Sequence, residues 1–224
     1  MRIYQAHIAL AQMIGDPITV GSPFTTVPDG VRYSKQLRDL YLYRAMVSII
    51  EGAIKQVVGM PDADASLALQ KLFPNYIIED DLTLDVADDI QADLTRRPAW
   101  VYGVYMNSGG STQFRKESLS RLYSVNTNIY REGYSDPMYA LVVPQALGVS
   151  DAYQNGILRL VVPPGYMTSW GASLHRCLYL PTPFNPATQV TTEVLDFEPM
   201  HFDTVLKIAK DLAMIDAQEI VPSR

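Results

Sequence analysis

Cys177 and His175 are the residues best suited to nucleophilic chemistry, because a thiol and an imidazole lie two positions apart in a segment that predicts a β-strand. Side chains at i and i+2 of a strand point to the same face. A reactive cysteine also needs a lowered pKa, which a helix N-terminus or a neighbouring cation supplies. The sequence offers neither, and a lone cysteine in an apolar strand is usually a small buried hydrophobe. We therefore expect no catalytic role for the pair.

Carboxylates are concentrated between residues 76 and 95, a stretch with no basic residue. A glycosidase requires two carboxylates in contrasting environments, whereas this run reads as uniformly solvated. It also lacks the alternating Asp/Asn ligands and the central glycine of a calcium loop. We interpret the segment as a solvated acidic face and predict no catalytic, metal or cofactor site. Its members are Glu79, Asp80, Asp81, Asp85, Asp88, Asp89 and Asp93.

Two further classes of function are disfavoured. Residues 108–111 (Ser-Gly-Gly-Ser) follow a predicted strand but carry no GxGxxG pattern and no phosphate-binding lysine, so they predict a hairpin turn. The net charge is −6, and the other residues sum to about +1 once the seven acidic residues of the stretch are set aside. No cluster of lysine and arginine indicates a surface that neutralises phosphates.

The composition favours a subunit that packs against other subunits. Charged residues make up 19% of the chain, and there are 14 tyrosines. Tyrosine buries a large ring while keeping a polar tip, which suits protein interfaces. The single cysteine excludes an internal disulfide and agrees with assembly in a reducing cytoplasm. The sequence shows no membrane span and no signal peptide at its N-terminus.

Helices are predicted near both ends of the chain. Residues 3–14 form a short helix with apolar positions at helical spacing. The strongest helix begins after Ser34, a plausible N-cap, and ends at Gly59. Its apolar residues cover more than one face, so either the domain is thick or a neighbouring subunit covers one side. A third helix spans residues 61–73, and a closing helix begins at Pro199.

The middle of the chain is rich in β-branched and aromatic residues. Strands are predicted at residues 99–106, 139–143, 157–162 and 175–180, and a short helix at 115–123. We predict an α+β fold in which the N-terminal helices and the C-terminal helix form a bundle with an inserted antiparallel β-sandwich or small barrel. The helical domain comprises residues 1–75 and 197–224, and the β-rich domain residues 76–196.

Three stretches together resemble the head-to-tail adaptors of tailed phages, the connector or gatekeeper family that includes tail tubular protein A. Residues 29–34 running into 40–45 are similar to the entry of the family's long helix. Residues 137–143 and 157–164 are similar to its β-hairpin, and residues 180–183 to the end of its next strand. Residues 198–203 are similar to the start of its closing helix. Residues 79–93 and 123–136 have no matching counterpart.

The resemblance implies a structural virion protein, not an enzyme. It would assemble in the host cytoplasm and form a ring of twelve subunits at the head–tail junction, between the portal protein and the tail nozzle or tube protein. A helix with two apolar sides suits contacts around a ring, so Tyr41, Ile50, Ile54 and Val58 are predicted at the subunit interface. Acidic side chains repel DNA that passes through a channel. Asp80, Asp81, Asp88 and Asp89 are therefore predicted to line it.

Other functions remain open from the residues alone. Another virion component, such as a capsid decoration or tail-completion protein, predicts the same composition but no ring with a channel. A small hydrolase that depends on Cys177 or on carboxylates predicts an activity that Cys177→Ser abolishes. A carbohydrate-binding β module would need Trp100, Trp170 and the tyrosines to line an exposed groove, but they lie in dense apolar strands.

Overall fold

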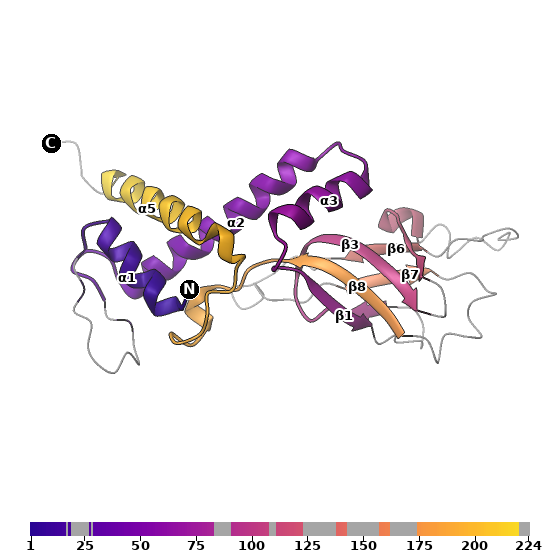
Figure 1. The fold of residues 1–224 in the computed structure, drawn as a ribbon, viewed down its shortest axis with the longest axis horizontal. Coiled ribbons are helices and arrows are strands. Elements are labelled where there is room, and N and C mark those ends of the chain that lie inside the picture. Colours follow the sequence, from indigo (N-terminus) through magenta and orange to yellow (C-terminus); the bar gives the residue numbers. More distant parts are fainter. Residues whose placement is uncertain are drawn as a thin grey trace, which may run out of the picture. The chain divides into compact units, whose positions relative to one another are not determined.

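The computed structural model describes residues 1–16, 18, 27, 29–82, 91–107, 111–122, 138–142, 157–161 and 174–219. The chain divides into two units. Unit 1 comprises Met1–Tyr76 and Pro183–Arg224, and unit 2 comprises Ile77–Thr182. Helices and strands are both present, which confirms the predicted α+β fold (Figure 1).

Unit 1 is helical, and local sequence signals set the ends of its longest helix. Helix α2 (Lys35–Val57) begins where the Ser34 hydroxyl accepts a hydrogen bond from the Leu37 amide at 3.3 Å. Gly59 follows the helix with φ +93°, a conformation that residues with a side chain rarely adopt. The predicted cap and stop are both confirmed. The other helices are α1 (Ile3–Met13), α3 (Asp62–Leu72), α5 (Phe202–Glu219) and the 3₁₀ turns η3 (Pro186–Thr188) and η4 (Pro199–His201).

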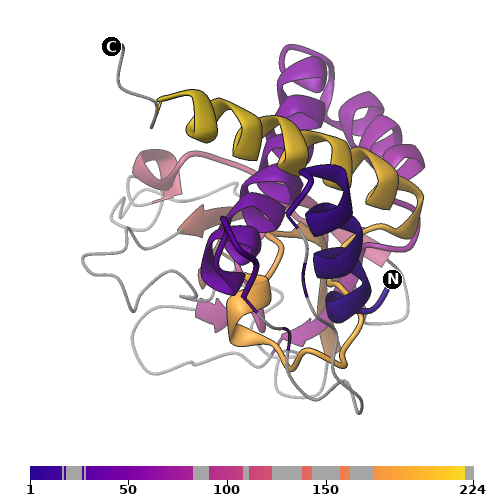
Figure 2. The same ribbon diagram turned by 90° about the vertical axis from the view of Figure 1, so that its left-hand side faces the viewer.

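The two-sided apolar pattern of α2 is explained within unit 1 itself. α2 contacts α1, α3, α5 and η3, and α1 also contacts α5 (Figures 1 and 2). The exposed fraction is 2% or less for Tyr41, Leu42, Ala45 and Met46. The first of the two sequence explanations, a thick domain, therefore accounts for this helix.

The segment before α5 belongs with the helices. The backbone amides of Ile3 and Tyr4 donate to the carbonyls of Glu193 (2.8 Å) and Thr191 (3.0 Å), and the Leu195 amide donates to the Met1 carbonyl (2.9 Å). The sequence interpretation assigned residues 183–196 to the β-rich domain, whereas here they lie in unit 1. Their prolines suggested β-type loops, but their partners are at the start of the chain.

Unit 2 contains two four-stranded sheets. In the first sheet the order is β1-β8-β3-β4, all antiparallel. In the second sheet the order is β2-β7-β6-β5, with β5 parallel to β6. The strands are β1 (Ile78–Leu82), β2 (Gln91–Asp93), β3 (Pro98–Asn107), β4 (Ser111–Gln113), β5 (Arg115–Lys116), β6 (Met138–Val142), β7 (Ile157–Val161) and β8 (Leu174–Pro181).

The two sheets contribute to one apolar core. Buried side chains of β1, β3 and β8 pack with those of β2, β6 and β7, and Val104, Cys177 and Tyr179 are fully buried within it. The four predicted strands are confirmed. β3 and β4 pair antiparallel, as the predicted hairpin requires, while the turn itself at residues 108–110 lies outside the described residues. The helix predicted from residue 115 is wrong at its start. Arg115 and Lys116 form β5 because they pair with β6, and helical structure begins at residue 119.

Candidate functional site

Of the four predicted channel-lining residues, the structure describes two, one of which is exposed and the other buried. The other two, Asp88 and Asp89, lie outside the described residues. Asp81 is exposed and lies 3.4 Å from Arg176, which also contacts Glu79 at 2.7 Å. Asp80 is only 7% exposed. Its prediction as a channel-lining, solvated carboxylate is therefore wrong, because alternation along β1 turns Asp80 inward between two exposed acids.

Asp80 instead holds the segment between β2 and β3 against β8. Its carboxylate accepts hydrogen bonds from the Thr95 amide (2.8 Å), the Thr95 hydroxyl (2.8 Å) and the Tyr179 hydroxyl (2.8 Å). The Tyr179 oxygen in turn accepts the Arg96 amide at 3.1 Å. These donors replace the water that the charged carboxylate loses on burial.

Cys177 lies beside this cluster and is fully buried. Burial, with a smaller contribution from the Asp80 charge, raises the pKa of the thiol to about 12. The reactive species of a cysteine is the thiolate, so Cys177 is a protonated core residue at neutral pH. The side chain of His175 is outside the described part of the structure, and the predicted alignment of the pair stays a prediction.

The four predicted interface residues separate into two kinds. Tyr41 and Ile50 are 2% and 3% exposed, so their prediction as intersubunit contacts is wrong because α1, α3 and α5 provide the partners of α2 inside the chain. The Tyr41 hydroxyl also donates to Asp216 at 2.8 Å. Ile54 is half-buried, whereas Val58 is 69% exposed. Val58 therefore remains available to a second subunit.

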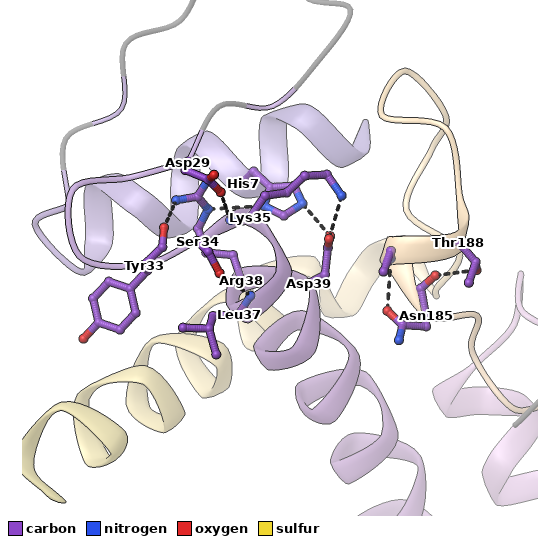
Figure 3. Close-up of polar contacts among 11 residues, drawn as sticks. His7, Asp29, Tyr33, Ser34, Lys35, Leu37, Arg38, Asp39, Asn185 and Thr188 are labelled. Carbon is purple, nitrogen blue, oxygen red and sulfur yellow. Dashed lines mark hydrogen bonds and ion pairs between the residues drawn. The ribbon is translucent and has the colours of Figure 1, made fainter. Parts of the chain in front are cut away.

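The most elaborate polar arrangement is a buried cluster where α1 meets the start of α2 (Figure 3). His7 Nε2 lies 2.8 Å from Asp39 Oδ1, and Lys35 Nζ donates to Asp39 Oδ2 at 2.6 Å. On the other side of the ring, Arg38 Nε donates to His7 Nδ1 over 3.4 Å. His7, Arg38 and Asp39 are all at most 1% exposed.

The protonation of His7 follows from its neighbours. Arginine is always a donor, so the Nδ1 atom facing Arg38 must carry the lone pair. The proton of the neutral ring then lies on Nε2 and is donated to Asp39. Burial is the largest influence on the ring and lowers the pKa of His7, which agrees with a neutral imidazole. The pKa of Asp39 is lowered because its bonds with His7 and Lys35 outweigh the effect of burial.

The segment before α2 closes the cluster through Asp16 and Arg38. Asp16 accepts the amides of Arg32 (2.8 Å) and Tyr33 (3.0 Å) and lies 3.8 Å from Arg38 Nη1. Arg38 Nη1 also donates to the Tyr33 carbonyl at 2.9 Å. A Cβ on Gly30 would overlap the Asp16 carboxylate, so only glycine fits where the backbone passes this close.

A fourth buried carboxylate joins the end of α3 to the start of α5. Glu198 is fully buried and accepts the amide (2.7 Å) and side-chain nitrogen (3.0 Å) of Asn75. Nearby, Tyr76 donates to Asp196 at 2.9 Å, and His201 Nε2 contacts the Leu72 carbonyl at 2.9 Å. His201 thus lies at the helix entry, where its side chain anchors α3.

The side chains of these clusters are bonded to other parts of the fold, so few of their polar atoms remain to contact a substrate. Both nitrogens of His7 are engaged, and Asp16, Asp39, Asp80 and Glu198 each accept two or more hydrogen bonds or ion pairs. Within the described ranges, no three His, Cys, Asp or Glu side chains gather as a metal site. The sequence analysis missed the His7–Asp39 cluster. Its one visible signal is a histidine on the apolar face of a helix.

No family model and no curated protein matches the chain. None of the described helices has the length and apolar character needed to cross a membrane. The function is therefore argued from the chain's own surface and interior.

Proposed function

We propose that this chain is a structural adaptor of a tailed-phage virion that forms a ring at the head–tail junction, between portal and tail. The resemblance to that family motivates the proposal; it is carried by residues 29–34 and 40–45, 137–143 and 157–164, 180–183, and 198–203. The finer fold description belongs with it: unit 1 is a helical bundle, and the two sheets of unit 2 form a sandwich around their common core.

The observation that carries the proposal is the distribution of exposed apolar side chains. All of the large hydrophobic residues that are exposed in the described structure belong to unit 1, and none to unit 2. An apolar surface that water would otherwise cover is typical of a protein-binding region. The exposed large hydrophobic residues of unit 1 are Met13, Val31, Leu37, Val58, Met60, Leu67, Val190, Val194, Met200, Met214 and Ile215.

Three of these residues lie at one end of α2. Val58 and Met60 form the connection between α2 and α3, and Leu67 lies on α3, with exposed fractions of 69%, 48% and 52%. Leu37, near the opposite end of α2, is 40% exposed. Distinct apolar regions at the two ends of one helix suit a head-to-tail contact between copies, which closes into a ring when the rotation between them permits.

The acidic segment keeps a place in the proposal. Glu79 and Asp81 are exposed on β1, and Asp81 with Asp88 and Asp89 remains proposed to face passing DNA. Asp80 is withdrawn from that set. Exposed carboxylates prevent adhesion of the phosphate backbone.

Assembly tests the proposal directly. The chain would be mixed with a portal protein from the same phage genome and imaged by electron microscopy, with ultracentrifugation to follow mass. We expect a ring stacked on the portal. Val58→Asp should abolish the ring, because a charge would have to be buried at the contact. Val190→Asp is the matched control, since Val190 is also a valine, is 59% exposed, and lies outside the contact assigned to the two ends of α2.

Two results would overturn the proposal. One is a chain that remains unassociated with portal and with tail components at high concentration. The other is ring formation by Val58→Asp equal to that of Val190→Asp, which would remove the assigned contact. A cysteine-dependent hydrolase is the weaker candidate, because Cys177 is fully buried and carries a raised pKa.

A further inference from the structure

The buried cluster around His7 joins three consecutive segments of the chain. His7 comes from α1, Lys35, Arg38 and Asp39 come from α2, and Asp16 and Asp29 come from the segment between the two helices. Figure 3 shows the His7 ring between Arg38 and Asp39, with Lys35 reaching Asp39 from the same helix. The contact between α1 and α2 is thus polar at its centre.

The groups that act on the His7 ring are two cations and one carboxylate. In the whole cluster, Lys35 and Arg38 carry two positive charges, and Asp16, Asp29 and Asp39 carry three negative charges, of which only that of Asp39 acts on the ring. The described groups that act on His7 are Asp39, Arg38 and Lys35, all on α2. Asp16, Asp29 and Asp39 act on Arg38. α5, which also contacts α1, contributes no charge that acts on the ring.

A second proton on His7 has no acceptor in this arrangement. It would go to Nδ1, the atom that now accepts a hydrogen bond from Arg38 Nε. Two donors would then face each other, and a third cation would join Lys35 and Arg38 around a single nearby carboxylate, Asp39. The ring is also fully buried, so no water stabilises the added charge.

The remaining attachments of α1 do not titrate with His7. Ile3, Ala6, Leu10 and Ala11 are buried apolar residues, and the first turn is held by backbone hydrogen bonds to residues 191 and 193. A proton taken up by His7 therefore acts on one contact, between α1 and α2. The rest of unit 1 keeps its own apolar and polar attachments.

We propose that His7, Arg38 and Asp39 form an acid-sensitive latch between α1 and α2. Uptake of one proton by His7 separates the two helices locally, under conditions in which the rest of unit 1 stays folded. This inference is independent of the adaptor function, since it concerns the coupling of one helix to the next.

The direction of the effect follows from linkage. The folded state lowers the pKa of His7 below its ordinary 6.5. The contribution of the neutral ring to stability is therefore complete above pH 6.5 and is lost as the pH falls from 6.5 toward the folded pKa. Within that window, each unit by which the pH falls raises the equilibrium constant for opening of α1 about tenfold.

Amide hydrogen exchange on the full chain, corrected for the intrinsic rate, measures this opening. Between pH 7.5 and 5.5, we expect protection to fall in residues 3–13 and to be retained in α5 and in the second half of α2. In His7→Gln the amide can still donate to Asp39 but cannot titrate, so protection of α1 should no longer depend on pH. His201→Gln is the matched control and should behave as the wild type.

Further measurements keep the test decisive if His7→Gln fails to fold. Lys35→Gln removes one cation from the cluster, makes protonated His7 less unfavourable, and should reduce the fall in protection. Nitrogen-15 spectra of the three histidines should show His7 neutral with its proton on Nε2 at pH 7.5. Unchanged protection of α1 at pH 5.5, loss of protection by all of unit 1 together, or a proton on Nδ1 would each overturn the latch.

Discussion

Two buried aspartates, one in each unit, are stabilised by different chemistry. Asp39 of unit 1 is held by a lysine ammonium and by a histidine that contacts an arginine, whereas Asp80 of unit 2 is held by two hydroxyls and a backbone amide. Neutral donors stabilise a carboxylate without adding charges that need their own partners. With charged partners, the stability of the buried carboxylate depends on the protonation of every group in the cluster.

The surfaces of the two units differ in the same sense. Unit 1 places charges inside and large apolar side chains outside, whereas the described surface of unit 2 carries no exposed large hydrophobic residue. Exposed large apolar side chains are typical of surfaces that bind other proteins, which is why the proposed contacts are placed on unit 1. The β unit has the more usual distribution, with its apolar residues in a common core.

The two units can be followed separately in one unfolding experiment. Both tryptophans, Trp100 and Trp170, belong to unit 2, while α1, α2, α3 and α5 belong to unit 1. Tryptophan fluorescence therefore reports unit 2, and circular dichroism at 222 nm chiefly reports unit 1.

The largest effect is expected for Asp39→Ala. It leaves His7 without its acceptor and leaves the buried positive charge of Arg38 with Asp16, 3.8 Å away, and the exposed Asp29 as its remaining described carboxylates. Removing one partner of a buried ionic cluster costs about 3 kcal/mol. The helical transition in urea should shift by that amount, with the fluorescence transition unchanged. Equal shifts of both transitions would show that the two units do not unfold independently.

Asp80→Ala should destabilise unit 2 and not unit 1, by less than Asp39→Ala destabilises unit 1. The Thr95 amide and the Tyr179 hydroxyl lose their acceptor, at a cost of about 2 kcal/mol. The fluorescence transition should shift and the helical one should not. Asp81→Ala is the control, because Asp81 is exposed and its loss should change stability by about 0.5 kcal/mol or less. A larger effect for Asp81 than for Asp80 would contradict the assigned burial.

Alanine substitutions at two glycines of unit 1 distinguish the effect of a steric overlap from the effect of helix propensity on stability. Gly30→Ala should destabilise the helical unit by about 1–2 kcal/mol, because its methyl group overlaps the Asp16 carboxylate. Gly52→Ala lies within α2 with open space around the new methyl group. It should stabilise the unit by about 0.5–1 kcal/mol, and circular dichroism during urea unfolding measures both. An increase in the free energy of unfolding for both substitutions would contradict the close approach of Gly30 to Asp16.

The smallest effect is expected for the exposed ion pairs of unit 2. Arg176 contacts Glu79 at 2.7 Å, and both side chains are about half exposed. Arg176→Gln should change the fluorescence transition by about 0.5 kcal/mol or less, and the change should shrink further in 0.5 M salt. A loss comparable to that of Asp80→Ala would mean that exposed charges contribute as much to this unit as the buried one.

Elements with local signals could be predicted from the sequence. The cap at Ser34, the glycine at residue 59 and the proline at residue 199 mark helix ends, and the run of β-branched and aromatic residues in β3 marks a strand. β1 was missed because Glu79, Asp80 and Asp81 are poor strand formers, and only pairing with β8 stabilises them there.

The polar clusters could not be predicted because their members meet only in the folded chain. His7 and Asp39 are 32 residues apart, and Asp80 and Tyr179 are 99 apart. The acidic stretch therefore looked uniformly solvated, although one of its members is buried. The two-sided pattern of α2 likewise did not distinguish neighbours within the chain from neighbours in a ring, and Tyr41 and Ile50 were assigned to the wrong kind of contact.

The connection of the two units has a consequence for how such chains can vary. Unit 2 begins with β1 and ends with β8, and these strands are antiparallel neighbours, with Ile78 opposite Tyr179. Its two ends therefore emerge side by side, about 5 Å apart. Recombination could exchange or delete the whole insertion while the helices on either side keep the same spacing. Closely spaced ends of this kind are the geometry at which insertion or exchange of a whole unit is tolerated.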